Sequence, residues 1–184
     1  MFLVYHKYHL IDYLYNSSKS MKEKKLILIR HAKSSWKYDV SDIDRPLKKR
    51  GVTDASIISK AFKEKEYTVN KIYSSPANRA FSTCKIFKNN LNWTDDQIEI
   101  VNKLYDFEGE SVLNFITTLD NTLETVIIFG HNHAFTAIAN DFGDTYIDNL
   151  PTSGLVVLKF NVNSWEYVKY GETELLMFPR DYRL

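Results

Sequence analysis

The sequence predicts an α/β fold: a mostly parallel central sheet with helices on both faces and an antiparallel strand pair at the C-terminal end. Two aliphatic runs, 26–29 and 126–129, are bounded by polar residues, which is typical of strands buried on both faces of a sheet. Strand-like stretches alternate with segments of helical period, and such alternation favours a parallel sheet. Two apolar stretches, 154–160 and 165–170, flank a short polar turn and predict the antiparallel pair.

The chain length predicts a single domain, because 184 residues suffice for one sizeable core. All the predicted elements fall within residues 21–184. Residues 1–20 begin with a short apolar run that polar side chains soon interrupt, and the cleavage site of a signal peptide does not follow. We therefore expect residues 1–20 to be an N-terminal extension outside the fold.

Charge and cysteine content exclude several classes of partner. The 24 Lys and Arg residues nearly balance the 23 Asp and Glu residues, so bulk charge predicts neither nucleic-acid nor membrane binding. The single cysteine, Cys84, excludes an intrachain disulfide framework and is typical of a reducing compartment. The apolar runs are too short to span a membrane. We therefore expect a cytoplasmic protein without a nucleic-acid or membrane partner.

The first predicted helix follows a polar loop that begins near Ser34 and is long enough to cover a site. The apolar stripe of this helix has the spacing of a helix packed on a sheet and comprises Val52, Ala55, Ile58 and Phe62. The stretch 69–75 then predicts a second strand.

A second helix is predicted to begin at Ser75 and Pro76, with the serine as N-cap and the proline in the first turn, and to end near Phe87. Arg79 falls in its first turn, beside the free N–H groups and the positive end of the helix dipole. A cation is unfavourable there unless an anion is bound. Arg79 is therefore a candidate phosphate ligand.

The rest of the chain predicts one more short strand, an acidic loop and two helices. The strand covers residues 98–101 and the acidic loop covers 104–110. The helices cover 111–119 and about 133–142, on either side of the aliphatic run 126–129.

Two histidines follow the two aliphatic runs. Arg30 and His31 come directly after the first run, and His131 comes after the second. Ligands of open α/β sheets bind beyond the carboxyl ends of the strands, so we expect these residues to share one crevice with Arg79. Two guanidinium groups suit phosphate oxygens, and a neutral imidazole is a competent nucleophile. This set could transfer a phosphoryl group without a metal ion or cofactor.

Four segments occur in the order found in the histidine phosphatase superfamily, and the chain most resembles its short, SixA-like phosphohistidine phosphatase branch from about residue 24 to 182. These segments are Arg30-His31-Ala32-Lys33-Ser34, Arg45-Pro46-Leu47 with Arg50-Gly51, Ser74-Ser75-Pro76 with Arg79-Ala80, and Gly130-His131-Asn132.

The resemblance implies a three-layer, phosphoglycerate-mutase-like fold and a metal-independent, cofactor-free phosphatase reaction in two steps. His31 would accept the phosphoryl group as a phosphohistidine, and water would then release it. The catalytic set would be His31, His131, Arg30 and Arg79. Arg30, Arg79 and His131 would bind the phosphate, and Ser34 would add a hydrogen bond.

The expected site has two candidates for a general acid, Asp106 and Glu108. The broader superfamily has a carboxylic acid in the loop where Asp106 and Glu108 stand, but neither residue lies in a matching motif. A surface position is the simpler interpretation for both. An imidazole leaving group also needs less help from an acid than an alkoxide does.

Several functions fit these residues. A phosphohistidine on a protein is the substrate we expect, while a small phosphate ester is an alternative, and so is a phosphate-binding module without turnover. Gly130-His131-Asn132-His133 mimics a metal-ligand pair of metallophosphoesterases, but the accompanying metal motifs are missing from the sequence, so we expect no metal site. The sequence leaves the oligomeric state open.

Overall fold

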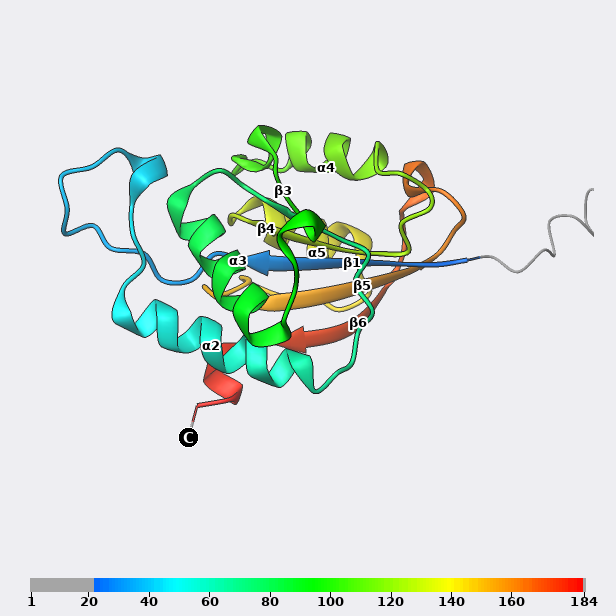
Figure 1. Ribbon diagram of the computed structural model, residues 1–184. Helices are drawn as coiled ribbons and strands as arrows, with labels where there is room; N and C mark the ends of the chain where they lie inside the picture. The colour runs from blue at the N-terminus through cyan, green and yellow to red at the C-terminus, as the bar shows by residue number, and fades with distance from the viewer. Residues whose placement is uncertain (1–21, 184) are drawn as a thin grey trace, which may run out of the picture.

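The computed structural model describes residues 22–183, so the expected extension, residues 1–20, lies outside the described residues. A six-stranded sheet with the order β3-β2-β4-β1-β5-β6 forms the centre of the fold (Figure 1). β5 runs against its neighbours, and the other strands all point the same way. The strands are β1 (Glu23–Arg30), β2 (Lys71–Ser74), β3 (Ile98–Ile100), β4 (Thr125–Gly130), β5 (Leu155–Asn161) and β6 (Glu172–Met177).

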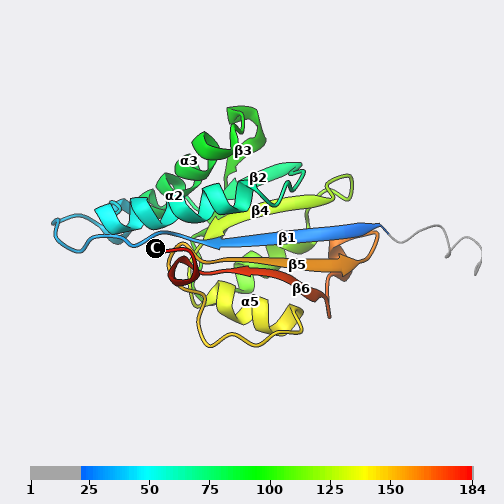
Figure 2. The same ribbon diagram turned by 90° about the horizontal axis from the view of Figure 1, so that it is seen from below.

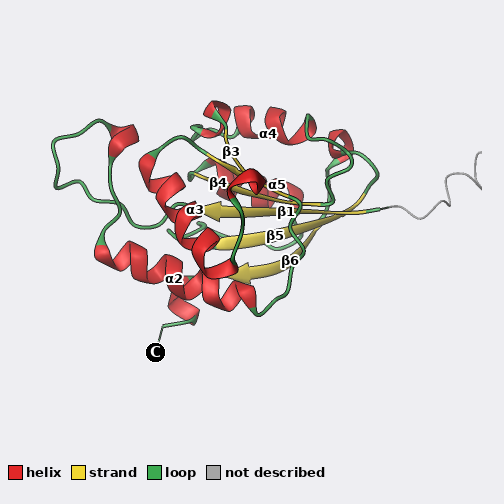
Figure 3. Cartoon of the chain, in the orientation of Figure 1, coloured by secondary structure: helices red, strands yellow, loops and turns green. Residues whose placement is uncertain are grey.

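Helices cover both faces of the sheet, which confirms the predicted α/β class with three layers. In Figure 2, α2 and α3 lie on one side of the strands and α5 on the other; Figure 3 shows the helices around the sheet. The helices are α2 (Lys49–Lys63), α3 (Asn78–Leu91), α4 (Glu110–Thr117) and α5 (Ala134–Phe142). Single 3₁₀ turns occur at Asp42–Asp44, Asp95–Gln97, Asn102–Leu104, Trp165–Tyr167 and Pro179–Asp181.

Strand β1 is buried on both sides, as its aliphatic run predicts. Ile27 and Ile29 pack in the core beneath α2 and α3. Leu26 and Leu28 pack in the opposite core beneath α4 and α5. All four side chains are fully buried, because successive residues of a strand point to opposite faces.

Three adjacent strands end in one row, and this row positions the site. Arg30 of β1 lies opposite Gly130 of β4, and Ser74 of β2 lies opposite Phe129. The ladder continues for one more residue on either side of β4: the His31 amide donates to Gly130 O, and the Ser75 amide donates to Phe129 O, each at 2.9 Å. Residues that follow β1, β2 and β4 therefore meet at the same edge.

The antiparallel pair is present, but the prediction of its second strand was wrong. β5 pairs with β6, Glu172–Met177, and not with 165–170. The latter stretch contains the 3₁₀ turn Trp165–Tyr167, in which Trp165 and Val168 both point into the core. Burial at a spacing of three residues suits a turn rather than the alternation of a strand.

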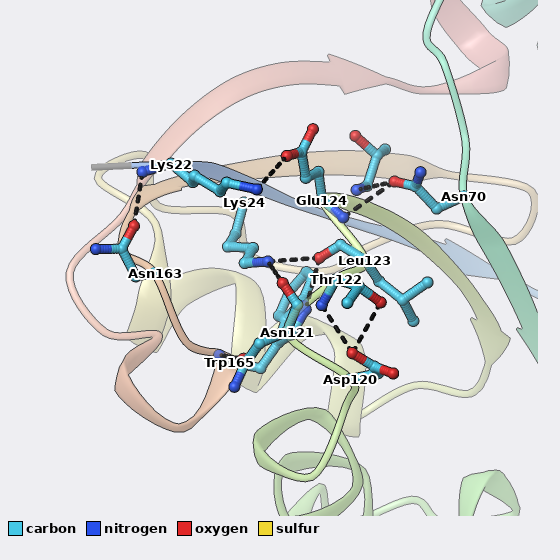
Figure 4. Close-up of polar contacts among 11 residues, drawn as sticks. Lys22, Lys24, Asn70, Asp120, Asn121, Thr122, Leu123, Glu124, Asn163 and Trp165 are labelled. Carbon is cyan, nitrogen blue, oxygen red and sulfur yellow. Dashed lines mark hydrogen bonds and ion pairs between the residues drawn. The ribbon is translucent and has the colours of Figure 1, made fainter. Parts of the chain in front are cut away.

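The amino end of the sheet holds a buried lysine (Figure 4). Lys24 is fully buried, and its Nζ donates to the carbonyl oxygens of Asn121 at 2.7 Å and Leu123 at 2.6 Å. The ammonium group also lies 5.6 Å from the centre of the Trp165 ring. These contacts satisfy the charge and tie β1 to the turn before β4. Burial nevertheless lowers the pKa of Lys24 from its ordinary value.

None of the helices among the described residues is both long enough and apolar enough to cross a membrane.

Candidate active site

His31 follows β1 and is only 8% exposed. Its Nδ1 lies 2.8 Å from the carbonyl oxygen of Ala32. Because a carbonyl can only accept, Nδ1 must carry the proton, and Nε2 keeps a free lone pair. Burial lowers the pKa of His31 to about 3, and the positive charges of Arg79 and Arg30 act in the same direction. His31 is therefore a neutral imidazole with a nucleophilic nitrogen at physiological pH.

His131 follows β4 and is fully buried beside His31. The centres of the two rings lie 5.3 Å apart. Its Nε2 is 2.8 Å from the hydroxyl oxygen of Ser75, and the ring of Phe107 covers it with 4.8 Å between ring centres. Burial lowers the pKa of His131 to about 3, helped by His31 and Arg79. The structure thus brings the two predicted histidines together.

The two predicted arginines lie at the same edge of the sheet. Arg30 donates through Nη1 to Leu150 O at 2.6 Å and Asn149 Oδ1 at 3.3 Å. Arg79, in the first turn of α3, donates through Nη1 to Asp42 O at 2.5 Å and through Nη2 to Asp42 Oδ2 at 2.8 Å. The protein holds both terminal nitrogens of Arg79 but only Nη1 of Arg30, and these contacts orient the two guanidinium groups.

The polar loop after β1 supplies residues that the sequence analysis missed. Asp42 binds Arg79, accepts from the Tyr105 hydroxyl at 2.6 Å, and places Oδ1 2.9 Å from Arg45 Nε. The Arg45 guanidinium stacks on Trp36, 3.5 Å from the ring centre. Although burial acts to raise it, the hydrogen bonds from Tyr105 and Arg79 hold the pKa of Asp42 below its ordinary value. Asp42 is therefore an ionised hub between the loop and α3.

Most of these side chains line an open cleft of about 340 Å³, whereas His131 and Tyr105 lie outside its lining. Among the described residues, six buried polar side-chain atoms have no hydrogen-bond partner, and three of these belong to this cluster and have no ion-pair partner either: Arg30 Nε, Arg79 Nε and His131 Nδ1. Arg45 Nε also makes no hydrogen bond, but it is ion-paired with Asp42. Buried donors are rarely left unpaired in native proteins, because each costs about 1–3 kcal/mol. A bound anion would satisfy the guanidinium donors. The cleft lining comprises Arg30, His31, Lys33, Ser34, Trp36, Asp42, Arg45, Arg79, Phe107, Asn132 and Thr152.

The remaining sequence candidates divide between the cleft and the surface. Ser34 is 7% exposed and lines the cleft beside His31. Asp106 instead accepts from the amides of Glu108, Gly109 and Val112 at 2.9–3.2 Å, at the start of α4. Glu108 is exposed. Neither of these carboxylates belongs to the cleft lining.

The segment after His31 is braced against the start of α2. The amide of Lys48 donates to Lys33 O, and the amide of Ser35 donates to Pro46 O, each at 2.8 Å. A Cβ on Gly51 would lie 2.3 Å from Lys33 O, so only glycine allows this approach. The glycine of the Arg50-Gly51 segment thus has a physical role in positioning the cleft.

Ser75 does not cap α3 as predicted. The N-cap is Ala77, and α3 begins at Asn78. The hydroxyl oxygen of Ser75 accepts from the Ala77 amide at 3.3 Å and contacts His131 instead. The sequence pattern therefore predicted the start of a helix in the right region but assigned the Ser75 hydroxyl to the wrong partner.

His131 and His133 resemble a metal-ligand pair in the sequence, but the structure does not bring them into a metal-binding cluster. His133 is exposed at the N-cap of α5, whereas His131 is fully buried. Within residues 22–183, no group of three or more His, Cys, Asp or Glu side chains is arranged to hold a metal ion.

Comparison with known proteins gives the same family as the sequence motifs. The family described as the histidine phosphatase superfamily (branch 1) matches residues 26–110. A chloroplastic protein of Arabidopsis thaliana is 27% identical over 164 residues, which cover 84% of this chain and 74% of that one.

Two solved structures extend the similarity to the whole fold. One from Agrobacterium tumefaciens, described as a phosphohistidine phosphatase SixA, is 26% identical with a TM-score of 0.71, covering 85% of this chain and 98% of the other. The protein histidine phosphatase SixA complexed with tungstate has a TM-score of 0.74 at 18% identity, covering 86% of this chain and 99% of the other. At that identity the second similarity shows the fold alone.

Proposed function

We propose that the chain is a member of the histidine phosphatase superfamily and that it hydrolyses phosphohistidine on a protein through a phosphoenzyme intermediate on His31. The observation that carries the proposal is the cluster of unpaired guanidinium N–H groups around a neutral His31 with a free Nε2.

The proposed reaction has two steps. In the first, the Nε2 lone pair of His31 attacks phosphorus, and the bond to the leaving group breaks; the leaving group departs with the electron pair and takes a proton from solvent. In the second, water attacks the phosphohistidine, releases phosphate and returns the electron pair to Nε2. Arg30, Arg79 and His131 stabilise the phosphoryl oxygens in both steps, and Ser34 adds a hydrogen bond. Because these guanidinium groups supply the positive charge, the proposed reaction is metal-independent.

The cleft favours a substrate whose leaving group needs little acid catalysis. Asp42 is the one carboxylate among the described residues that lines the cleft, and it is already paired with Arg79. Asp106 is bound to backbone amides that hold its pKa down against the effect of burial. We therefore assign no acid role to Asp106 or Glu108. Imidazole leaves more readily than an alkoxide, which supports phosphohistidine over an alkyl phosphate.

The rim of the cleft supports a protein as the carrier of the phosphoryl group. Trp36 is 75% exposed, Tyr38 57%, Val40 46% and Phe107 40%. The loop that bears the first three projects beyond the end of the sheet (Figure 1). Tyr38 and Val40 lie outside the cleft lining, so a small ester in the cleft has little use for them. Exposed aromatic and apolar side chains beside a site are typical of a protein-binding surface.

The phosphoenzyme can be tested directly. Wild-type protein incubated with a ³²P-labelled phosphohistidine protein should acquire acid-labile label, and His31→Asn should acquire none and lose activity. A labelled His31→Asn variant, or equal rates for the two proteins, would contradict the assignment of His31. Activity should persist in the presence of a chelator.

The substrate class can be tested at the rim. Tyr38→Ser and Val40→Ser should lower kcat/KM for a phosphohistidine protein by about tenfold, the cost of a modest interface contact, and leave an aryl phosphate unaffected. The matched control is Tyr170→Ser, because Tyr170 is 89% exposed and precedes β6, at the other edge of the sheet. Equal effects on both substrates, or none, would favour a small phosphate ester instead.

A further inference from the structure

Ser75 stands at the point where β2 ends and contacts His131, the fully buried histidine beside His31. Ser75 is fully buried as well. Its hydroxyl oxygen accepts a hydrogen bond from the Ala77 amide at 3.3 Å and lies 2.8 Å from His131 Nε2. A serine hydroxyl has a single proton, so these two contacts determine where that proton can go.

Two arrangements of protons fit the short contact, and they differ in cost. If His131 Nε2 carries the proton, Ser75 accepts twice, and its own hydroxyl proton has no acceptor among the described residues. A buried donor without an acceptor is destabilising, because it loses its hydrogen bonds to water without gaining another. If Ser75 donates to Nε2 instead, the hydroxyl is satisfied as both donor and acceptor. The second arrangement is favoured, and it puts the proton of the neutral imidazole on Nδ1.

The Nδ1 atom of His131 is the buried ring nitrogen that lacks a partner within the described part of the chain. It shares this condition with the Nε atoms of Arg30 and Arg79. With a proton, Nδ1 is a hydrogen-bond donor, as those guanidinium groups are, and an anion bound beside them would satisfy it. Without one, it would present a lone pair to the anion and repel it. The tautomer therefore decides whether a neutral His131 helps or opposes phosphoryl binding.

We propose that Ser75 is a positioning residue that holds neutral His131 in the Nδ1–H tautomer, so that His131 serves as a hydrogen-bond donor to the phosphoryl group without being protonated. This inference rests on the proposed function and assigns a role to a residue outside the expected catalytic set. His31 has the same tautomer for a different reason, because the Ala32 carbonyl accepts from its Nδ1. One tautomer thus gives a nucleophile at position 31 and a donor at position 131.

The tautomer can be read directly from ¹⁵N NMR of the imidazole nitrogens in the full chain without substrate. At pH 7 the wild-type protein should show His131 with a protonated Nδ1 and a bare Nε2. A spectrum with the proton on Nε2, or with both nitrogens protonated, would overturn the proposal. Because this measurement needs no turnover, it stands apart from the proposed function: a chain with this tautomer and no phosphatase activity would refute only the latter.

Variants then connect the tautomer to binding. Ser75→Ala should reduce the Nδ1–H population of His131, leave the His31 signals unchanged, and weaken tungstate binding and kcat/KM by about tenfold, the value of one buried hydrogen bond to an anion. The matched control is Ser74→Ala, since Ser74 is equally buried but donates to Ser75 O at 3.0 Å and not to a histidine. The control should change binding less than about twofold. An unchanged His131 tautomer in Ser75→Ala would contradict the assignment.

Discussion

The imidazole rings of His31 and His131 lie 5.3 Å apart, inclined by 55°, at the ends of neighbouring parallel strands. Burial lowers the pKa of both to about 3, and arginine charges act in the same direction. Two uncharged imidazoles can share this space, whereas two imidazolium ions beside arginines would repel one another.

The protein should therefore become less stable as the pH is lowered through the acidic range. The unfolded chain protonates each histidine near pH 6.5, but the folded chain does not until about pH 3, so the unfolded state binds more protons between these values. The free energy of unfolding should decrease by about 2 kcal/mol for each of the two histidines between pH 7 and pH 5. Urea denaturation at pH 7, 6 and 5 measures this slope.

The contribution of one ring can be isolated with His131→Gln. This variant should lose about half of the decrease between pH 7 and 5, while its decrease below pH 4, where carboxylates such as Asp42 become protonated, should stay. An identical slope in both proteins would show that the pKa of His131 is not lowered in the folded state.

Removal of the Asp42 charge should make the protein depend on an added anion. Asp42→Asn leaves the buried guanidinium groups of Arg79 and Arg45 without their counter-charge and should cost about 1–2 kcal/mol, because the Asp42 side chain is itself partly exposed. Tungstate can replace the carboxylate as partner. Thermal denaturation should therefore show a larger rise in Tm on adding tungstate for Asp42→Asn than for wild type.

Asp44→Asn is the control for this effect. Asp44 lies in the same 3₁₀ turn but is exposed and accepts from Ser41 at 2.6 Å. Its response to tungstate should match the wild type. If Asp42→Asn also responds like the wild type, Asp42 does not neutralise the anion-binding arginines.

Gly51→Ala should disturb the cleft from outside it. The added methyl group would lie 2.3 Å from Lys33 O. This oxygen belongs to the backbone, which cannot move aside as the end of a flexible side chain can. We expect a loss of about 1–3 kcal/mol in stability and lower activity, since the shifted segment follows His31 directly. Alanine at Gly143 would meet the Thr173 hydroxyl at 2.3 Å, far from this segment, so it should destabilise the fold while the folded variant keeps wild-type activity.

The buried lysine should matter for stability alone. Lys24→Ala removes the donor shared by Asn121 O and Leu123 O and leaves a cavity beside Trp165, which should cost about 3 kcal/mol. Lys22→Ala, with a side chain that is 59% exposed, should cost less than about 0.5 kcal/mol. Refolded Lys24→Ala should keep wild-type kcat, because the cleft lies at the opposite edge of the sheet.

The sequence was sufficient where the signal is local or periodic. The runs 26–29 and 126–129 predicted β1 and β4, and their ends correctly placed Arg30, His31 and His131 at one edge. It was insufficient where a contact depends on the path of a loop. Asp42 reaches Arg79 across 37 positions and Tyr105 across 63, and spacing rules carry no information about such pairs.

Local rules also misled where a tertiary contact competes with them. Ser75 has the sequence context of a helix cap, but its hydroxyl contacts His131, which lies 56 positions away. The stretch 165–170 has strand-forming residues, but burial of Trp165 and Val168 on one side turns it into a 3₁₀ segment. In both cases the preference of the local segment is smaller than the gain from the distant partner.

Because β1, β2 and β4 end side by side, the site should tolerate few insertions or deletions inside these strands. Deleting one codon inside β4 would rotate the second imidazole to the opposite face of the sheet, and deleting two would restore the face but withdraw the ring by about 6.6 Å, more than a hydrogen bond can span. Insertions in the turns at the amino edge carry no such penalty. Length variation among homologues should therefore concentrate there, while the interiors of these strands keep constant length.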